Sequence, residues 1–260
     1  MQAILFTISY DGSRYAGWQV QDNALTIQEC MMKAGRSFLK EDFTITTASR
    51  TDAGVHALGQ RALLKTESTM PANKIKHAFN HYLPKDIQIW KAETVSQDFH
   101  PRYDAERKIY VYKIWNGTVE MPLMAKDHYL FERETDFQKM QYIAGKFVGE
   151  HNFNAFSAKK KSVKDTVRRV MRCEVKEVLQ EHVGPEAGRA YYIYIEGNGF
   201  LYNMVRIIAG CILDWGSAKM SEEEIDRQME AAFQTGEREF AARTLPAKGL
   251  TLLEIFYGSN

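Results

Sequence analysis

Cysteine is scarce in this 260-residue chain, and the common metal-binding and phosphate-binding motifs are absent from it. Its three cysteines, Cys30, Cys173 and Cys211, lie far apart and form no CxxC pair. The sequence therefore predicts neither a zinc site nor a disulfide framework, and we interpret the three as thiols of a cytoplasmic protein. No glycine-rich phosphate loop, GxSxG elbow or HExxH pair supports a nucleotide-binding, serine-hydrolase or zinc-protease class. We expect no metal and no cofactor.

Long apolar runs are missing too. No apolar stretch approaches the roughly 20 residues that a membrane-spanning helix needs. Residues Met1–Ile4 lead directly into a strand pattern and show no signal-peptide pattern, so we expect no membrane association. Hydrophobic residues nevertheless make up 45% of the chain and charged residues 26%. That composition is typical of a globular protein with a sizeable core.

Charge is unevenly distributed, although the formal net charge is only +1. Between Ser157 and Lys176, eight basic residues stand against two acidic ones, whereas seven acidic residues stand against three basic ones between Lys219 and Glu239. A compact cationic segment is the usual footprint of a phosphate-bearing partner, and a solvated charge run is the alternative. The expected RNA phosphate contacts in this segment are Lys159, Lys160, Lys161, Arg168 and Arg169.

Each half of the chain shows a similar order of strand and helix patterns. In the first half, strand patterns cover 3–10, 44–48, 60–66 and 87–95, and helix patterns begin at Thr26 and Pro71. In the second half, strand patterns cover 108–116, 167–178, 190–196 and 250–257. Helix patterns there cover 135–147 and 201–215, and a further helix is capped by Ser221.

This order, β-α-β-β-α-β, is that of the split βαβ or ferredoxin-like domain. We therefore predict an α+β protein of two ferredoxin-like domains, residues 1–103 and 104–260. A mostly antiparallel sheet shared by the two would place a central cleft where they meet, and clefts between domains are common ligand sites. The fold alone names no function.

Asp52 is the candidate for chemistry in the first half. It is the only acidic residue between Phe43 and Thr66, whereas two-metal phosphate chemistry and paired-carboxylate glycosidases need at least two. A lone carboxylate suits nucleophilic or base catalysis. Arg50, two residues earlier, would point the same way in an extended loop and would keep the carboxylate ionised. The alternative is a structural Asp52–Arg50 pair, and the residues alone leave both readings open.

Three further side chains in this sequence have a possible function. Arg206 lies within an apolar helical run and needs a partner, for which Asp52 is a candidate; the alternative is that its long side chain reaches solvent or phosphate. Tyr110 and Tyr112 share one face of a strand, where either could stack on a base or belong to the core. His56 could act as an acid or base, but such a residue is more often a loop or core contact.

Several stretches together resemble the bacterial tRNA pseudouridine synthase A family along nearly the whole chain. The most specific is the string from Arg50 to Ala57, RTDAGVHA. Ser49 departs from the family pattern, which usually has glycine before Arg-Thr-Asp. The remaining matching stretches are Tyr10–Gln19, Phe99–Tyr103, Tyr110–Tyr112, Phe200–Arg206 and Lys248–Leu252.

The resemblance implies a tRNA pseudouridine synthase that acts on uridines at nucleotides 38 to 40 of the anticodon stem-loop. It implies that Asp52 is the catalytic aspartate, flanked by Arg50 and Arg206, that Tyr110 stacks on the target uracil and that Leu250 lines the pocket. It also implies a homodimer with each tRNA spanning both subunits. Arg14, in the first matching stretch, joins the expected phosphate contacts.

Isomerising uridine to pseudouridine requires no redox change and no group donor, which agrees with the expectation of no cofactor. Two other function classes compete with this one. A non-enzymatic RNA-binding module would use exposed aromatics on a ferredoxin-like sheet, but it gives the isolated Asp52 no purpose. A metal-dependent nuclease would need a second carboxylate near Asp52, and none is present in the sequence around it.

Overall fold

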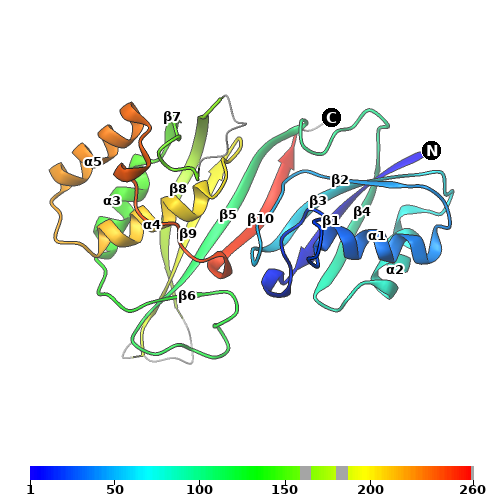
Figure 1. The fold of residues 1–260 in the computed structure, drawn as a ribbon, viewed down its shortest axis with the longest axis horizontal. Coiled ribbons are helices and arrows are strands. Elements are labelled where there is room, and N and C mark those ends of the chain that lie inside the picture. Colours follow the sequence, from blue (N-terminus) through cyan, green and yellow to red (C-terminus); the bar gives the residue numbers. More distant parts are fainter. Residues whose placement is uncertain (159–164, 180–186, 259–260) are drawn as a thin grey trace. The chain divides into compact units, whose positions relative to one another are not determined.

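The computed structural model describes residues 1–158, 165–179 and 187–258. The chain forms two compact units. Unit 1 comprises Met1–Lys108 and Thr251–Asn260, and unit 2 comprises Ile109–Leu250. Both units combine helices with largely antiparallel strands (Figure 1), so the predicted α+β class is confirmed.

Unit 1 is a mostly antiparallel sheet with two helices, and its strands follow the order β4-β1-β3-β10, with β2 paired to β3. Strand β1 is antiparallel to both β3 and β4, while β10 runs parallel to β3, with Thr251 opposite His56. Its elements are β1 (Gln2–Tyr10), the short 3-10 helix η1 (Gly12–Arg14), α1 (Ile27–Phe38), β2 (Thr44–Thr47), β3 (His56–Thr66), α2 (Ala72–Tyr82), β4 (Ile87–Val95) and β10 (Leu250–Tyr257).

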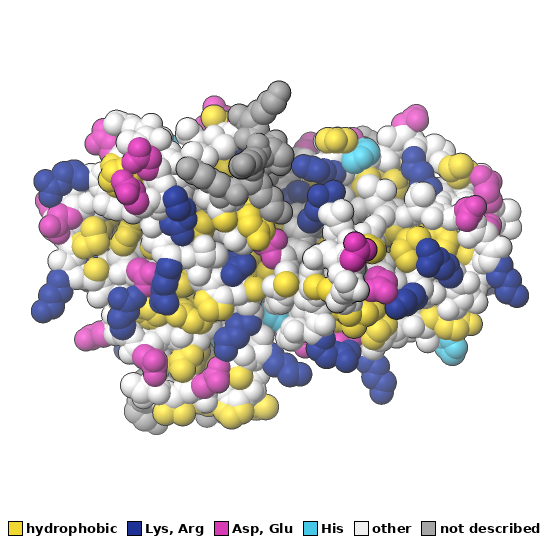
Figure 2. All heavy atoms as spheres, in the orientation of Figure 1, with side chains coloured by type: hydrophobic (Ala, Val, Ile, Leu, Met, Phe, Trp, Pro, Cys, Tyr) yellow, Lys and Arg dark blue, Asp and Glu magenta, His cyan; other side chains and the backbone are white. Residues whose placement is uncertain are grey.

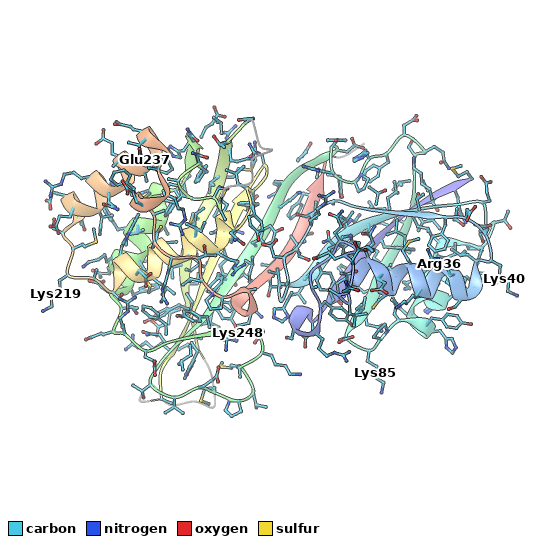
Figure 3. The ribbon with its side chains drawn as sticks, in the orientation of Figure 1. Arg36, Lys40, Lys85, Lys219, Glu237 and Lys248 are labelled. Carbon is cyan, nitrogen blue, oxygen red and sulfur yellow. The ribbon has the colours of Figure 1, made fainter. Side chains whose placement is uncertain are left out.

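Helix α1 begins where the sequence predicts. The Thr26 side chain accepts a hydrogen bond from the backbone N–H of Glu29 at 3.3 Å, which satisfies one of the free donors of the first turn. Arg36 lies in the last turn, where a cation interacts favourably with the helix dipole (Figure 3). Phe79 of α2 meets Phe6 of β1 and Phe38 of α1 edge-on at 5.2 and 5.1 Å. These rings join both helices to the sheet in one core.

Unit 2 is built from a second set of strands in the order β5-β9-β8-β7, with β6 paired to β5. Strands β7, β8 and β9 pair antiparallel, and β5 and β6 pair parallel. Its elements are β5 (Ala105–Asn116), whose first residues belong to unit 1, β6 (Tyr129–Phe131), α3 (Phe137–Lys146), β7 (Gly149–Asn152), β8 (Val167–Val178), β9 (Arg189–Gly197), α4 (Met204–Gly216), α5 (Glu222–Thr235) and the 3-10 helices η2 (Arg238–Phe240) and η3 (Ala247–Gly249).

Helix α4 is the centre of the core of unit 2. Eleven of its residues are buried, among them Ile207, Cys211 and Ile212. Helix α3 packs on both α4 and β8, and Phe137 of α3 stacks on Tyr191 of β9 at 5.7 Å. A helix that is apolar on nearly all sides must be surrounded by protein, so its few polar positions lie at places the fold determines closely.

Three differences from the predicted organisation are visible. Strands β6 and β7 were not predicted, because segments of three and four residues are too short to show a period. The last strand, β10, was assigned to the second domain, yet its residues from Thr251 onward belong to unit 1, where they hydrogen-bond to β3. Sequence order alone does not reveal such a return. The first unit also extends to Lys108 rather than 103.

Candidate active site

The segment that carries Asp52 connects strands β2 and β3. Arg50 is exposed on it, Thr51 is buried and Asp52 is half-buried. Strand β3 already begins at His56, four residues earlier than predicted. The connection is therefore short, and its ends are fixed by the sheet of unit 1. We call residues 48–55 the Asp52 loop.

Asp52 opens a tight turn. The backbone N–H of Val55 donates to the Asp52 carbonyl at 3.2 Å, and Gly54, the third residue of the turn, has a φ of 78°. A positive φ at this position is the pattern of a type II turn, which favours glycine because a Cβ is disfavoured there. The turn fixes the backbone of Asp52 and hence the direction in which its carboxylate leaves the chain.

Residues 12–18 pack directly against the Asp52 loop. The backbone N–H of Trp18 donates to the Thr51 carbonyl at 3.1 Å, and that of Gly54 donates to the Tyr15 carbonyl at 3.2 Å. Gly17 has a φ of 92°, and a Cβ on it would lie 2.5 Å from the Thr51 carbonyl oxygen. Glycine is therefore required at position 17 for two reasons, backbone conformation and space.

Buried side chains also hold the Asp52 loop in place. Gln60 of β3 is fully buried, and its Nε2 donates to the Ser49 carbonyl at 2.7 Å and to the Tyr10 hydroxyl at 3.3 Å. The Tyr10 hydroxyl lies 2.8 Å from Oγ1 of Thr51. One amide thus positions the residues on both sides of Arg50. Sequence reasoning missed Gln60, since its neighbours become apparent only in the folded sheet.

We expect Gln60→Met to lower the free energy of unfolding by about 1–3 kcal/mol, because the buried Tyr10 hydroxyl and Ser49 carbonyl lose a donor. Urea unfolding measures the change. Gln138, exposed on α3, gives the matched control, for which Gln138→Met should change stability by less than about 0.5 kcal/mol. Equal effects of the two substitutions would show that the Gln60 amide adds nothing.

Lys108 of β5 reaches the start of the loop. Its Nζ donates to the Ala48 carbonyl at 2.9 Å. Burial, with a further contribution from the nearby cation Arg102, lowers the pKa of Lys108 to about 8. The carbonyls of Ala48 and Ser49 are therefore held by Lys108 and Gln60 from two different strands. Sequence reasoning placed Lys108 only at the start of a strand.

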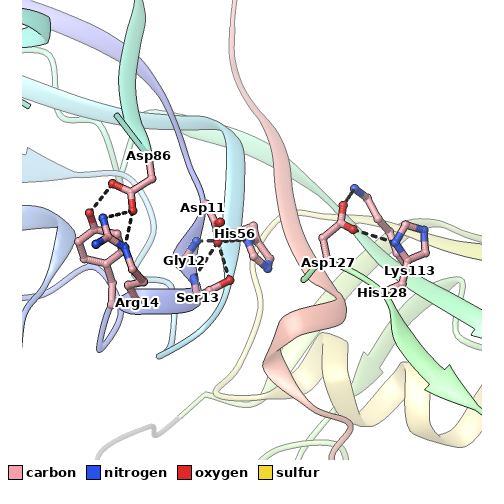
Figure 4. Close-up of polar contacts among 10 residues, drawn as sticks. Asp11, Gly12, Ser13, Arg14, His56, Asp86, Lys113, Asp127 and His128 are labelled. Atoms are coloured by element: carbon pink, nitrogen blue, oxygen red, sulfur yellow. Dashed lines mark hydrogen bonds and ion pairs between the residues drawn. The ribbon is translucent and has the colours of Figure 1, made fainter. Parts of the chain in front are cut away.

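Asp86 anchors the other side of the 12–18 segment (Figure 4). It accepts from the Tyr15 hydroxyl at 2.7 Å and from Nε and Nη2 of Arg14 at 2.9 and 2.6 Å. Burial acts to raise the pKa of Asp86, but the hydrogen bonds from Tyr15 and Arg14 outweigh it and lower that pKa. Arg14 thus has a carboxylate partner. Its side chain is still 67% exposed, and its contact with RNA phosphate stays a prediction.

His56 has a structural partner in the same region. Its Nδ1 accepts the backbone N–H of Gly12 at 3.1 Å and lies 3.3 Å from Oδ1 of Asp11 (Figure 4). A Cβ on Gly12 would lie only 2.0 Å from the Val55 carbonyl oxygen, so the chain segments are in close contact here. These contacts agree with the reading of His56 as a loop contact.

Each predicted site residue of unit 2 is held by its own contacts. Tyr110 of β5 is 6% exposed, and its ring meets Phe200 edge-on at 5.3 Å. Arg206 of α4 donates from Nε to the Leu245 carbonyl at 2.6 Å and from Nη1 to Oδ1 of Asn203 at 3.0 Å. These neutral acceptors fix the orientation of the guanidinium. Its pairing with Asp52 stays a prediction.

Leu250 follows a tight connection in unit 2. Gly249 packs so closely on Tyr112 that a Cβ would lie 2.7 Å from that ring, and the Tyr112 hydroxyl donates to the Pro246 carbonyl at 2.7 Å. Lys248, which is labelled in Figure 3, pairs with Glu120 at 2.8 Å. Leu250 itself is buried. Tyr112 is thus a core residue that positions this connection, which leaves Tyr110 as the candidate for stacking.

The predicted basic segment is described only in part. Lys159, Lys160 and Lys161 lie outside the described residues. Nη1 of Arg168 donates to the Asp165 and Val167 carbonyls at 3.2 and 2.5 Å, and Arg169 is exposed. On the face drawn in Figure 2, cationic and anionic side chains are interspersed. Phosphate binding by this segment stays a prediction.

Unit 2 contains a polar network that the sequence did not indicate (Figure 4). Asp127 pairs with Nζ of Lys113 at 2.6 Å and with Nδ1 of His128 at 2.8 Å. Nε2 of the buried His128 lies 3.2 Å from the Tyr192 hydroxyl. The hydrogen bond from His128, together with the hydrogen bond and the positive charge of Lys113, holds the pKa of Asp127 well below its usual range. The network ties the segment before β6 to strands β5 and β9.

Asp127→Asn should make the free energy of unfolding depend less on pH in the acidic range. A carboxyl whose pKa is lower in the folded chain stabilises the fold above its unfolded pKa, and this stabilisation disappears as the pH falls from about 5 toward 2. Urea unfolding at pH 7 and pH 3 should show a smaller difference for the variant than for the wild type. Asp98→Asn, at an exposed position, is the control. The same pH dependence in all three proteins contradicts the expectation.

Within the described residues, no group of three or more His, Cys, Asp or Glu side chains could hold a metal ion. No helix found there is long and apolar enough to cross a membrane. The three cysteines are free and buried. In unit 1, the Asp52 carboxylate therefore stands on a closely held turn, and the exposed Arg50 lies two residues before it.

Comparison with known proteins identifies the family to which the chain belongs. The sequence model of a family described as tRNA pseudouridine synthase matches residues 7–104 and 143–258. The chain belongs to this family, and it is therefore an enzyme of the isomerase class.

Its relatives specify the type. The chain is 42% identical over 257 residues to the tRNA pseudouridine synthase A of Ruminiclostridium cellulolyticum, a match that spans 99% of this chain and 100% of the relative. Proteins of the same name from Acetivibrio thermocellus and Caldicellulosiruptor saccharolyticus are 38% and 39% identical with the same coverage. These findings confirm the resemblance to the tRNA pseudouridine synthase A type.

The chain aligns with one from "Crystal Structure of a Cbf5-Nop10-Gar1 Complex" at a TM-score of 0.36 and 10% identity, with 96% of this chain and 49% of that chain covered.

Proposed function

We propose that this protein isomerises uridine to pseudouridine in the anticodon stem-loop of tRNA, with Asp52 as the catalytic nucleophile. The observation that carries the proposal is the Asp52 loop. A single carboxylate stands on a turn whose preceding residues are hydrogen-bonded through Ala48, Ser49 and Thr51. Catalysis depends on such fixed geometry, because a reacting group must be held close to its target. The family and its named relatives supply the substrate class.

The reaction breaks the bond between C1′ and N1, turns the uracil and joins C1′ to C5. When the carboxylate attacks C1′, the electron pair of the broken bond goes to N1. C5 then attacks C1′ and displaces the carboxylate, after which C5 loses its proton and N1 gains one. Attack at C6 of the ring and removal of a ribose proton are the other chemically possible roles of Asp52. All three balance without an oxidant, a reductant or a group donor.

The other predicted residues have supporting roles in this proposal. The target base must leave the helical stack before it can react, and Tyr110 would stack on it while Leu250 lines the pocket. The guanidinium groups of Arg50 and Arg206 would keep the Asp52 carboxylate ionised. The orientation of Arg206, fixed by Leu245 and Asn203, supports a positioned charge rather than a mobile one.

The family resemblance supports the finer parts of the proposal. Nucleotides 38, 39 and 40 are the proposed targets, a homodimer is the proposed active form, and the cytoplasm, where tRNA is modified, is the proposed location. The free cysteines agree with a reducing compartment.

Mapping pseudouridines in tRNA from a strain that lacks this protein tests the proposal. Pseudouridine should disappear from one or more of nucleotides 38 to 40 and should return when the wild-type gene is restored. A gene carrying Asp52→Asn should not restore it. An unchanged pseudouridine map in the deletion strain would contradict the proposed substrate.

A further inference from the structure

A compact turn in unit 1, residues 100–104, is built to hold its shape. The backbone N–H of His100 donates to Oδ2 of Asp104 at 2.9 Å, and that of Asp104 donates to the His100 carbonyl at 3.1 Å. Nδ1 of His100 accepts from the backbone N–H groups of Arg102 and Tyr103, both at 3.2 Å. The Tyr257 hydroxyl donates to the Pro101 carbonyl at 2.9 Å, which ties the turn to β10.

This turn displays Tyr103. Among the residues that the structure describes, Tyr103 is the most exposed aromatic side chain, at 78%, compared with 57% for Trp90 and 49% for Tyr82. Its ring lies 4.2 Å from that of His100, at 31° to it. A side chain this exposed contributes little apolar burial to folding. Large aromatics presented on a fixed backbone are typical of binding surfaces.

The turn is linked to the start of the Asp52 loop through Tyr257, because the Arg61 guanidinium lies 5.6 Å from the Tyr257 ring and the Arg61 carbonyl accepts from the backbone N–H of Ala48 at 2.9 Å. Arg102 is near enough to Lys108 to contribute to its lowered pKa, and Lys108 Nζ is 2.9 Å from the Ala48 carbonyl of the loop. Arg50, on the loop itself, is exposed, as is Arg102. An exposed aromatic ring and an exposed cation therefore stand on a turn that is linked to the start of the loop carrying the proposed nucleophile. This combination binds unpaired nucleotides, since rings stack on bases and cations contact phosphates.

We propose that Tyr103 stacks on an unpaired base of the tRNA beside the target nucleotide, while Arg102 contacts an adjoining phosphate. The inference rests on the proposed function. A uridine that leaves the stack uncovers one face of each neighbouring base, and a fixed, exposed ring near the catalytic loop replaces the lost stacking partner. Base pairs within a continuous helix have both faces covered and offer Tyr103 no such surface.

Tyr103→Ala should weaken tRNA binding and raise KM by about 5- to 100-fold, the range expected for the loss of one base–aromatic contact. Because the ring does not touch the reacting atoms, kcat should stay within about twofold of the wild type. Tyr103→Phe retains the ring and should retain the affinity. Arg102→Met should reduce the salt dependence of tRNA binding by about one phosphate contact.

Tyr82→Ala is the control, because Tyr82 is also exposed in unit 1 but ends helix α2; it should leave the tRNA affinity unchanged. Wild-type affinity and KM in Tyr103→Ala would overturn the inference. A loss of self-association in that variant, with unchanged affinity per active protein, would instead place the ring between two copies and would also overturn it. Failure of the proposed function is recognised separately, as wild-type protein that produces no pseudouridine in tRNA.

Discussion

Asp52→Asn should abolish pseudouridine formation while leaving the fold and tRNA binding intact. The amide is nearly the same size as the carboxylate, so the Val55–Asp52 turn and the hydrogen bonds of the loop backbone can persist. It cannot act as a nucleophile or a base. Removal of a catalytic nucleophile generally lowers kcat by at least about three orders of magnitude. Release of tritium from C5-labelled uridine in tRNA measures the reaction directly, because C5 loses its proton only when the new bond forms.

Asp42 provides the matched control for this experiment. It lies ten residues earlier in unit 1 and is exposed, so Asp42→Asn should release tritium at the wild-type rate. Turnover of Asp52→Asn near the wild-type level would remove Asp52 from its catalytic role. It would then favour the structural reading of the Asp52–Arg50 pair. Loss of turnover caused by a chelator would instead revive the metal-dependent alternative.

Gly17→Ala should have the second largest effect on activity. Its Cβ would lie 2.5 Å from the Thr51 carbonyl oxygen and 3.1 Å from the carbonyl carbon of Asp52, both backbone atoms. The loop must move to make room, and a displacement of about 1 Å at a catalytic group can lower the rate roughly 100-fold. The φ of 92° adds backbone strain. The rate of tritium release and the free energy of unfolding measured in urea should therefore both decrease. The rate should decrease by more than the loss of folded protein accounts for.

Gly145→Ala separates this effect from the general cost of adding a methyl group. Gly145 lies in α3, and a Cβ there meets nothing within 4 Å. Alanine is the better helix former by about 1 kcal/mol, so this variant should be as stable as the wild type or more stable, with normal turnover. If Gly17→Ala behaves in the same way, residues 12–18 do not hold the Asp52 loop in its active position.

The periodic elements were predictable because their signals are local. Strands β4 and β8 have the predicted bounds, 87–95 and 167–178, and helix α1 begins at its predicted cap. Strand β7, Gly149–Asn152, has only four residues and no large apolar side chain, so no hydrophobic pattern in the sequence distinguished it from a loop. Local signals indicate where a strand lies in the sequence but not which strand it pairs with, which explains why the pairing of β10 with β3 was missed.

The candidate site could likewise be predicted from the sequence only in part. Asp52 could be found from the sequence because it stands in a specific string and lacks neighbouring carboxylates. The side chains that hold its loop, Tyr10, Gln60 and Lys108, come from three different strands. Each is an ordinary residue type for a strand, and only the folded sheet shows that they converge. The Asp127 network was missed for the same reason, since Lys113 and Tyr192 are distant in sequence.

The return of β10 to unit 1 has a consequence for synthesis on the ribosome. Strand β3, which begins at His56 directly after the Asp52 loop, pairs with a strand that begins at Leu250. A nascent chain can fold its early segments while later ones are still being made. The sheet beside the Asp52 loop, however, lacks one strand until Leu250–Tyr257 has been synthesised, long after β3. Such distant pairing slows folding, and here it delays completion of the sheet of unit 1 until β10 is available, so nascent chains that end before β10 should hold the Asp52 loop on an incomplete sheet.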